Sequence, residues 1–252
     1  MADDVVLTQR LGRTWLITLN RPQAMNAINE ALVEGLLAAV RRLDEDPELT
    51  VGVLTGAGNR AFSAGMDLKA FSSGEDMRGI MAFIKDGARK PLIAAVEGLA
   101  MAGGLELVLS CDLLVAARGA RFGIPEVRVG LFASAGGVLR LPGRVGYGKA
   151  MEMALTGEPI LAEDAATLGL VNRLTEPGGA LTAALEIAER IGQNAPLAVA
   201  TSKQLIRMAR GITETEYWTA QEPYETAILA SSDSKEGPLA FAEKRAPRWT
   251  GA

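Results

Sequence analysis

The chain has 252 residues, of which 48% are hydrophobic and 22% are charged, and its formal net charge is −4. This composition is typical of a soluble globular protein with a large core, and the lack of a basic surplus argues against nucleic-acid binding. The sequence contains no histidine and one cysteine, Cys111, which excludes Ser-His-Asp and Cys-His catalysis, histidine-based zinc sites and an intrachain disulfide.

The sequence predicts a cytoplasmic protein with no membrane partner. Residues Met1 to Asp4 lack the positive charge and the following apolar run of a signal peptide. The longest apolar candidate, Leu92 to Leu109, is interrupted by Glu97, Glu106 and three glycines, and it falls short of the ~20 apolar residues that span a bilayer. A single cysteine fits a reducing compartment.

The first two-thirds of the chain alternates between strand and helix patterns. Residues 14–20 are β-rich and stop before Pro22, and Asn29 is expected to cap a helix that continues to Glu45. Three short apolar runs are typical of strands covered on both faces: residues 51–55, 93–96 and 113–116. The alternation predicts an α/β fold with mostly parallel strands.

Beyond Gly146 the patterns become helical, with at most a short strand near residues 170–171. The expected helices are residues 149–156, 162–168, 178–192, 197–210, 214–229 and 235–244. Asn194 to Pro196 is the expected boundary between two regions. We expect residues 1–194 to form an α/β core and residues 195–252 to form a helical region.

Two segments that follow buried strands are rich in small residues. Ala61 to Leu68 lets a ligand approach the backbone, although an ordinary strand-to-helix turn has the same composition. Gly103 and Gly104 begin a helix, whose unpaired N–H groups and positive dipole end can stabilise an oxyanion. Glu106, in the first turn among apolar neighbours, is either functional or caps its own helix.

A third segment, Ala120 to Val127, carries Glu126 twenty residues after Glu106. One helix and one strand fit between the two glutamates, which would return both side chains to the same edge of a sheet. Two carboxylates in one pocket can hold different protonation states and act as an acid and a base. The alternative is a surface glutamate beside Pro125.

Three other features have simpler interpretations. Residues 143–150 nearly match a phosphate-binding loop, but Ala150 replaces the magnesium-binding Ser or Thr and no long buried strand precedes them. Cys111 has no histidine to activate it and is expected to be buried and structural. The apolar stretch from Phe71 to Lys85 either lines or covers a ligand pocket or is an ordinary helix core.

Together the segments resemble the crotonase family, the enoyl-CoA hydratases and isomerases, over nearly the whole chain. The resemblance lies in Asn20–Ala27 (NRPQAMNA), Phe62–Leu68 (FSAGMDL), Ala102–Leu107 (AGGLEL), Cys111-Asp112, Phe122–Glu126 (FGIPE), Thr156-Gly157, Ala162–Ala165, Gly169–Val171 and Phe241–Arg245 (FAEKR). Each motif is weak alone, but their order and spacing are highly specific.

The resemblance implies a fold, a site and a ligand. The fold is α/β, a spiral of ββα units followed by an all-helical trimerisation region, in a homotrimer or a dimer of trimers. The family's two hydratase glutamates match Glu106 and Glu126, and its oxyanion-hole N–H groups match Ala64 and Gly103. The ligand is an acyl-CoA thioester, which is the substrate, so no metal or separate cofactor is implied. Residues matching the family's coenzyme A contacts are Ala24, Ala64, Gly65, Met66, Asp67, Leu68 and Gly103, with Phe241 and Lys244 reaching the coenzyme A of a neighbouring subunit.

The implied reaction is hydration of a trans-2-enoyl-CoA to a 3-hydroxyacyl-CoA. A double-bond isomerase needs only one base, so the pair of glutamates favours a hydratase. Another crotonase-type lyase and a non-catalytic acyl-CoA-binding protein remain alternatives. The chain departs from the hydratase pattern at Ser134, which stands where the family has a glycine whose N–H helps to order the catalytic water. A positive φ there would strain a serine.

Overall fold

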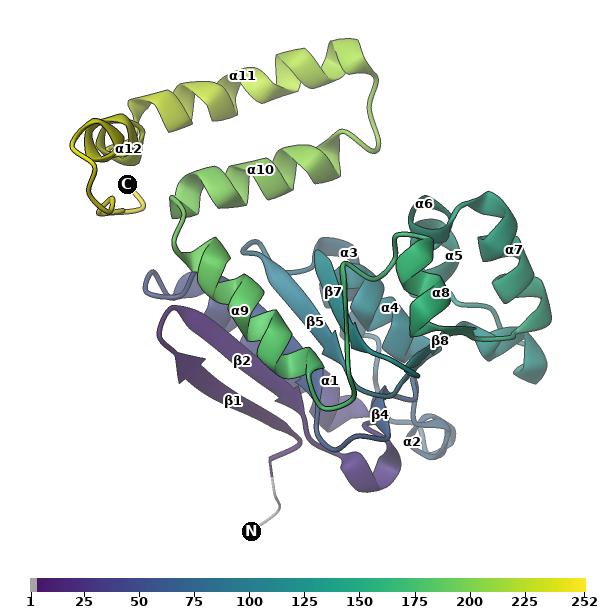
Figure 1. Cartoon of the computed structure of the whole chain (residues 1–252). Coiled ribbons are helices and arrows are strands. Elements are labelled where there is room, and N and C mark those ends of the chain that lie inside the picture. The colour runs from purple at the N-terminus through teal and green to yellow at the C-terminus, as the bar shows by residue number, and fades with distance from the viewer. Residues whose placement is uncertain (1–3) are drawn as a thin grey trace.

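The structure, a computed structural model, describes residues 4–252; the residues 1–3 that contribute to the predicted lack of a signal peptide lie outside it. Two sheets and their covering helices form the body of the protein (Figure 1). The strands are β1 (Val6–Leu11), β2 (Thr14–Leu19), β3 (Val51–Gly56), β4 (Ala61–Ser63), β5 (Leu92–Val96), β6 (Leu99–Met101), β7 (Leu113–Ala117), β8 (Arg121–Gly123), β9 (Ile160–Leu161) and β10 (Arg173–Thr175).

The helices follow the strands in a repeating order. They are η1 (Pro22–Ala24), α1 (Glu30–Glu45), α2 (Leu68–Ser72), α3 (Ile80–Asp86), α4 (Gly103–Ser110), η2 (Pro125–Val129), α5 (Gly137–Arg140), α6 (Pro142–Val145), α7 (Tyr147–Thr156), α8 (Ala162–Thr167), α9 (Ala180–Gly192), α10 (Pro196–Met208), α11 (Glu214–Ala230) and α12 (Asp233–Ala242), where η denotes a 3-10 helix. Among residues 4–252, no helix has the length and apolarity needed to cross a membrane.

The chain alternates between the two sheets, which confirms the expected spiral of ββα units. The larger sheet has the order β1-β2-β3-β5-β7-β10, parallel apart from the β1–β2 hairpin, and the smaller has the order β4-β6-β8-β9. Each of β3, β5 and β7 lies in the larger sheet, and the strand after it, β4, β6 or β8, lies in the smaller one. The parallel strands β4, β6 and β8 therefore end at one common edge.

The core lies on both faces of the larger sheet. On one face α1 buries the predicted stripe of Leu32, Leu36, Val40 and Leu43, and Asn29 caps the helix by accepting the N–H of Leu32. On the other face the alanines of α9 pack on β3, β5 and β7. Glu97 fixes the start of α9, because its carboxylate accepts the N–H groups of Gly178 and Ala180, each at 2.8 Å.

The C-terminal helices extend away from the two sheets (Figure 1). α10 begins at Pro196, beside the predicted boundary, and neither α10 nor α11 contains a buried residue. Lys203 of α10 ties this region to the core through a 2.6 Å ion pair with Asp112. The division at residue 194 stays a prediction.

Several short elements have no clear signal in the sequence pattern. The chain beyond Gly146 is not wholly helical, because β9 joins the smaller sheet and β10 joins the larger one, with β10 just after the expected strand at 170–171. The second strands β4, β6 and β8 have three residues each, too few to show a period of two. The hairpin strand β1 is mostly exposed and lacks an apolar signature.

Candidate active site

Three segments meet at the edge where the short parallel strands end. Ala64 to Asp67 follow β4, Ala102 and Gly103 follow β6, and Glu126 follows β8. Residues of all three segments line one cavity of about 920 Å³. The first two segments were expected directly after the long buried strands, whereas all three follow the short second strand of a pair. Glu106 and Glu126 are thus separated by the rest of α4 and two strands, rather than by one helix and one strand.

Glu106 is almost fully buried, with 3% of its surface exposed. It lies in the first turn of α4, and its Oε1 accepts the N–H of Gly137 at 2.9 Å. Burial raises its pKa to about 7, helped by the charge of Glu126, while the Gly137 hydrogen bond and Arg140 act in the opposite direction. A carboxyl group with this pKa exchanges protons readily at neutral pH.

Glu126 enters the same cavity from η2. Its pKa is raised, chiefly because burial disfavours the charged form. Its Oε2 atom is buried without a hydrogen-bond partner among the described residues. A buried oxygen without a partner is costly in a folded protein, and a protonated carboxyl or a bound ligand relieves that cost.

One of the two expected backbone donors is available and the other is not. Gly103 is the first residue of α4, so its N–H has no acceptor within the helix. The N–H of Ala64, by contrast, donates to the carbonyl of Met25 at 3.0 Å and is not free for a ligand. Met66 supplies the second free donor: its bridge with Ile28 uses the Gly65 carbonyl and the Asp67 N–H, so the Met66 N–H has no partner among residues 4–252.

Glycine brings these two donors together. Gly65 has φ +90°, and a side chain there would come within 2.9 Å of the Gly103 nitrogen. A side chain on Gly104 would lie 2.2 Å from the Ser63 carbonyl oxygen, so α4 can begin against β4 only without one. Ala102, just before the helix, adopts φ 51° and ψ −127°, a conformation that non-glycine residues rarely adopt. Backbone strain thus accumulates beside the two free N–H groups.

The N-terminal motif at residues 20–27 holds the turn before β4 and the loop after it in place through hydrogen bonds and an ion pair. The buried Asn26 donates to the carbonyls of Ala57 and Ala61 at 3.0 and 2.8 Å, which fixes the turn before β4. Arg21 forms a 3.0 Å ion pair with Asp67, whose carboxylate also accepts the first free N–H groups of α2. Asp67 is therefore engaged within the protein.

The other predicted coenzyme A contacts divide into two groups. Ala64, Met66, Leu68 and Gly103 line the cavity. Ala24 does not line it and lies in η1, directly before Met25. Phe241 and Lys244, at and just beyond the end of α12, are exposed and do not line the cavity. α12 lies far from α4 (Figure 1). A single chain does not bring these two residues to the site.

The segment from Phe71 to Lys85 forms one wall of the cavity, as one of its two interpretations predicted. Met77, Ile80, Met81 and Ile84 line the cavity, while Phe83 is buried in the core. Ser134 also lines the cavity, and it is not among the non-glycine residues with positive φ. The strain expected at Ser134 is absent, and the positive φ falls on Gly136 at 93°.

Two features are confirmed as structural. The Cys111 thiol is buried and lies 3.5 Å from the Leu107 carbonyl, and burial raises its pKa well above the usual range. Residues 143–150 run from α6 into α7 with no strand before them, which is incompatible with a phosphate-binding loop.

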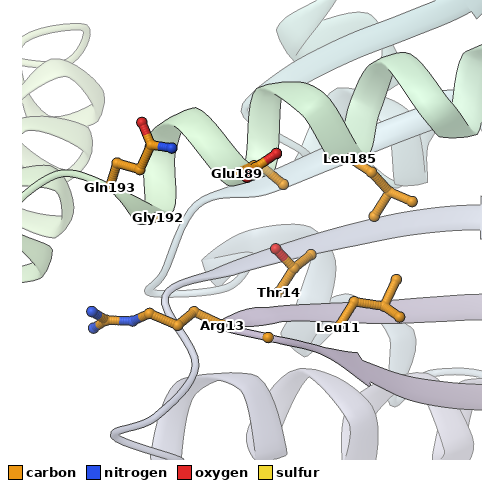
Figure 2. A pocket seen from close by; sticks show the side chains of 9 residues that line it. Leu11, Arg13, Thr14, Leu185, Glu189, Gly192 and Gln193 are labelled. Carbon is orange, nitrogen blue, oxygen red and sulfur yellow. The ribbon is translucent and has the colours of Figure 1, made fainter.

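A smaller cavity of about 400 Å³ lies between the β1–β2 turn and α9 (Figure 2). Its charged lining residues, Arg13 and Glu189, are both exposed. It contains neither a buried carboxylate nor a glycine-rich helix start, so the larger cavity is the candidate site.

Comparison with known proteins identifies a family model, relatives and solved structures that are similar to this chain. A family model described as enoyl-CoA hydratase/isomerase matches residues 13–252. An enoyl-CoA hydratase of Mycobacterium tuberculosis is 40% identical, over 96% of this chain and 95% of its own length. A carnitinyl-CoA dehydratase of Salmonella arizonae is 39% identical over the full length of both chains. The crystal structure of an enoyl-CoA hydratase from Mycobacterium marinum is 52% identical, with a TM-score of 0.96 over 99% of this chain and 100% of that one.

Proposed function

The chain belongs to the enoyl-CoA hydratase/isomerase family, and from this premise we propose that it hydrates a trans-2-enoyl-CoA to a 3-hydroxyacyl-CoA. The observation that carries the proposal is the meeting of the buried Glu106, the half-buried Glu126 and two free backbone N–H groups on one cavity. An isolated pair of carboxylates or an isolated oxyanion site would fit many reactions. Their combination fits the addition of water to an acyl thioester.

The N–H groups of Met66 and Gly103 receive the thioester oxygen. They polarise the conjugated double bond and stabilise the enolate that forms when water adds at C3. Each donor of this kind contributes about 3–4 kcal/mol to lowering the barrier when it is aimed at the developing charge. In this proposal Met66 takes the role that the family resemblance assigned to Ala64, because the Ala64 N–H is bonded to Met25.

The two glutamates divide the proton transfers between them. Glu106, as the carboxylate, takes a proton from water while the water oxygen bonds to C3. Glu126, as the acid, gives a proton to C2 when the enolate collapses. The pKa of about 7 leaves Glu106 partly ionised near neutral pH, and burial raises the pKa of Glu126, which favours the protonated acid that the mechanism needs there. The reaction needs no metal and no redox cofactor, since coenzyme A is part of the substrate.

The acyl group is proposed to lie against α3, whose side chains form an apolar wall of the cavity. The relatives include both enoyl-CoA hydratases and carnitinyl-CoA dehydratases, so the acyl chain must be determined by assay.

We also propose that the protein forms a homotrimer or a dimer of trimers. α10 and α11 bury no residue in the single chain, and Ile206, Trp218 and Leu229 are exposed on them. Packing of these helices against further copies covers this apolar surface. It also allows Phe241 and Lys244 of one copy to reach coenzyme A bound to another.

The test is to mix the purified protein with crotonyl-CoA and, separately, with trans-2-decenoyl-CoA. Hydration removes the absorbance of the conjugated thioester, and the Glu126→Gln variant serves as the control. We expect turnover by the wild-type protein on at least one substrate and its loss in the variant.

Other outcomes overturn the proposal in distinguishable ways. Turnover of a 3-enoyl-CoA, but of neither 2-enoyl-CoA, identifies an isomerase. Binding of butyryl-CoA with no turnover of any substrate identifies a non-catalytic acyl-CoA-binding protein.

A further inference from the structure

Arg140, the last residue of α5, connects three helices around the site. Its Nη1 donates to the Ser110 hydroxyl at 2.9 Å, and its Nη2 donates to the carbonyl of Ile84. The first of these partners lies at the end of α4 and the second near the end of α3. The Ser110 hydroxyl in turn donates to the Glu106 carbonyl at 2.8 Å. One guanidinium therefore joins α5 to the carboxyl ends of two helices, where cations are favoured.

The first residue of α5 donates a hydrogen bond to Glu106, the proposed base. Gly137 is this first residue, and the Gly137 N–H is the donor to Glu106 Oε1. α5 has only four residues, and a helix this short does not maintain its position by its own hydrogen bonds. Gly136 before it adopts φ 93°, a conformation that favours glycine, the residue whose backbone is least restricted. The orientation of the Gly137 donor thus depends on what anchors α5.

We propose that Arg140 is a positioning residue for Glu106: by anchoring α5 to α3 and α4, it holds the Gly137 N–H on the Glu106 carboxylate. The inference rests on the proposed function only for its effect on turnover. The contact between α5 and Glu106 exists in the structure whatever reaction the site performs.

Arg140 also acts on Glu106 through its charge. The guanidinium lowers the pKa of Glu106, opposing burial and the Glu126 carboxylate. The elements packed on α4 are β4, β6, α3 and α5, and their other charged groups, Lys85 and Asp86, lie exposed at the end of α3. Beyond these, Arg144, Arg207 and Arg210 surround Arg140. Loss of the Arg140 charge therefore leaves Glu106 harder to ionise.

The experiment compares Arg140→Gln and Arg140→Lys with Arg144→Gln. Arg144 is a matched control, because it too is half-buried and donates to a carbonyl at the end of α4, that of Cys111. Among the described residues, its side chain makes no hydrogen bond to α5 or to Glu106. We expect Arg140→Gln to lower kcat for crotonyl-CoA hydration by about 10- to 100-fold, the range for a slightly displaced reacting group, with KM changed by less than about threefold. Arg140→Lys should recover part of the loss, and Arg144→Gln should keep kcat within about twofold.

Two further measurements separate positioning from loss of structure. In the Arg140→Gln variant, the acid limb of the kcat profile should move to higher pH. In a Glu106→Gln background, Arg140→Gln should cause no further loss of kcat, because its effect passes through Glu106. Thermal unfolding and butyryl-CoA binding verify that each variant is folded.

The proposal is overturned if Arg140→Gln keeps wild-type kcat and pH dependence, or if Arg144→Gln reproduces its effects. If the wild-type protein hydrates no enoyl-CoA, the proposed function fails separately. The Glu106 carboxyl is then titrated directly by carbon-13 NMR, with Glu106→Gln to assign the signal. A Glu106 pKa that rises in Arg140→Gln, and also rises to a smaller extent in Arg140→Lys, which keeps the charge, supports the positioning role. An unchanged pKa in both variants, or a rise in Arg140→Gln alone, rejects it.

Discussion

The N–H of Ala64 donates a 3.0 Å hydrogen bond to the carbonyl of Met25, while the N–H of Met66, two residues later, has no partner in the described chain. Both residues line the same cavity, so their position does not show which N–H is available to a ligand. Only the hydrogen bonds distinguish the two N–H groups. The Ala64 bond holds the loop after β4 in place, and this hold leaves the Met66 N–H beside the start of α4.

The first prediction concerns this pair. Replacing the Met66 amide by an ester, through incorporation of the matching α-hydroxy acid, removes the N–H without changing the side chain. We expect kcat for enoyl-CoA hydration to fall by about 10²–10³-fold, as for the loss of one oxyanion donor. The same exchange at Ala64 removes the bond to Met25 and should lower thermal stability more than kcat. A larger loss of kcat at Ala64 would return the role to that residue.

The second prediction concerns the two carboxylates. Glu106→Gln and Glu126→Gln should each lower kcat by about 10²–10⁴-fold, because each variant removes one proton transfer and keeps the shape of the side chain. Butyryl-CoA should bind to both with little change. Glu34→Gln, at an exposed position on α1, is the control and should have wild-type kcat. Near-full activity in both site variants would be incompatible with the two-glutamate mechanism.

The third prediction is a bell-shaped dependence of kcat/KM on pH. Glu106 must be ionised to accept a proton, so activity should fall as the pH drops below its pKa of about 7, by up to about tenfold per pH unit. Glu126 must be protonated to donate, so activity should also fall as the pH rises and Glu126 loses its proton, which its raised pKa moves to a higher pH than for an ordinary glutamate. The apparent values belong to the interacting pair rather than to one residue. A profile that stays flat between about pH 5 and pH 7 would contradict the assignment of Glu106 as the base.

The fourth prediction links the Glu106 pKa to stability. Its folded-state pKa is raised from 4.5 to about 7, so the folded protein binds the proton more tightly than the unfolded chain does. This contribution to stability is complete below about pH 4.5 and is lost as the pH rises through about 7. Glu106→Gln does not suffer this loss. Relative to the wild type, the variant should gain about 2–3 kcal/mol between pH 5 and pH 8.

Urea unfolding at the two pH values, at one protein concentration because oligomers unfold in a concentration-dependent way, measures this difference. Glu189→Gln, at an exposed position on α9, keeps Glu106 and should show the same change in stability between the two pH values as the wild type. An equal shift in both variants would show that the effect is a general change in charge.

The sequence by itself determined the fold class and the segments that line the candidate site. A buried apolar stripe, an asparagine cap and short apolar runs are local signals, and α1, β3, β5 and β7 lie where those signals predict. The two glutamates and the glycines at the start of α4 were also evident, because a charged or side-chain-free residue is unusual among apolar neighbours. The order of the motifs then indicated the family.

Tertiary structure alone decided which groups act together. Whether Ala64 or Met66 offers a free N–H depends on where the Met25 carbonyl lies, and neighbouring residues of one loop give no signal of that. Gly137 reaches Glu106 across 31 residues of chain, and Arg140 is tied to α3 across 56. These contacts form only after the two sheets bring distant segments to one edge. Periodicity and propensity describe the chain over a few residues, whereas hydrogen-bond partners and burial are fixed by packing.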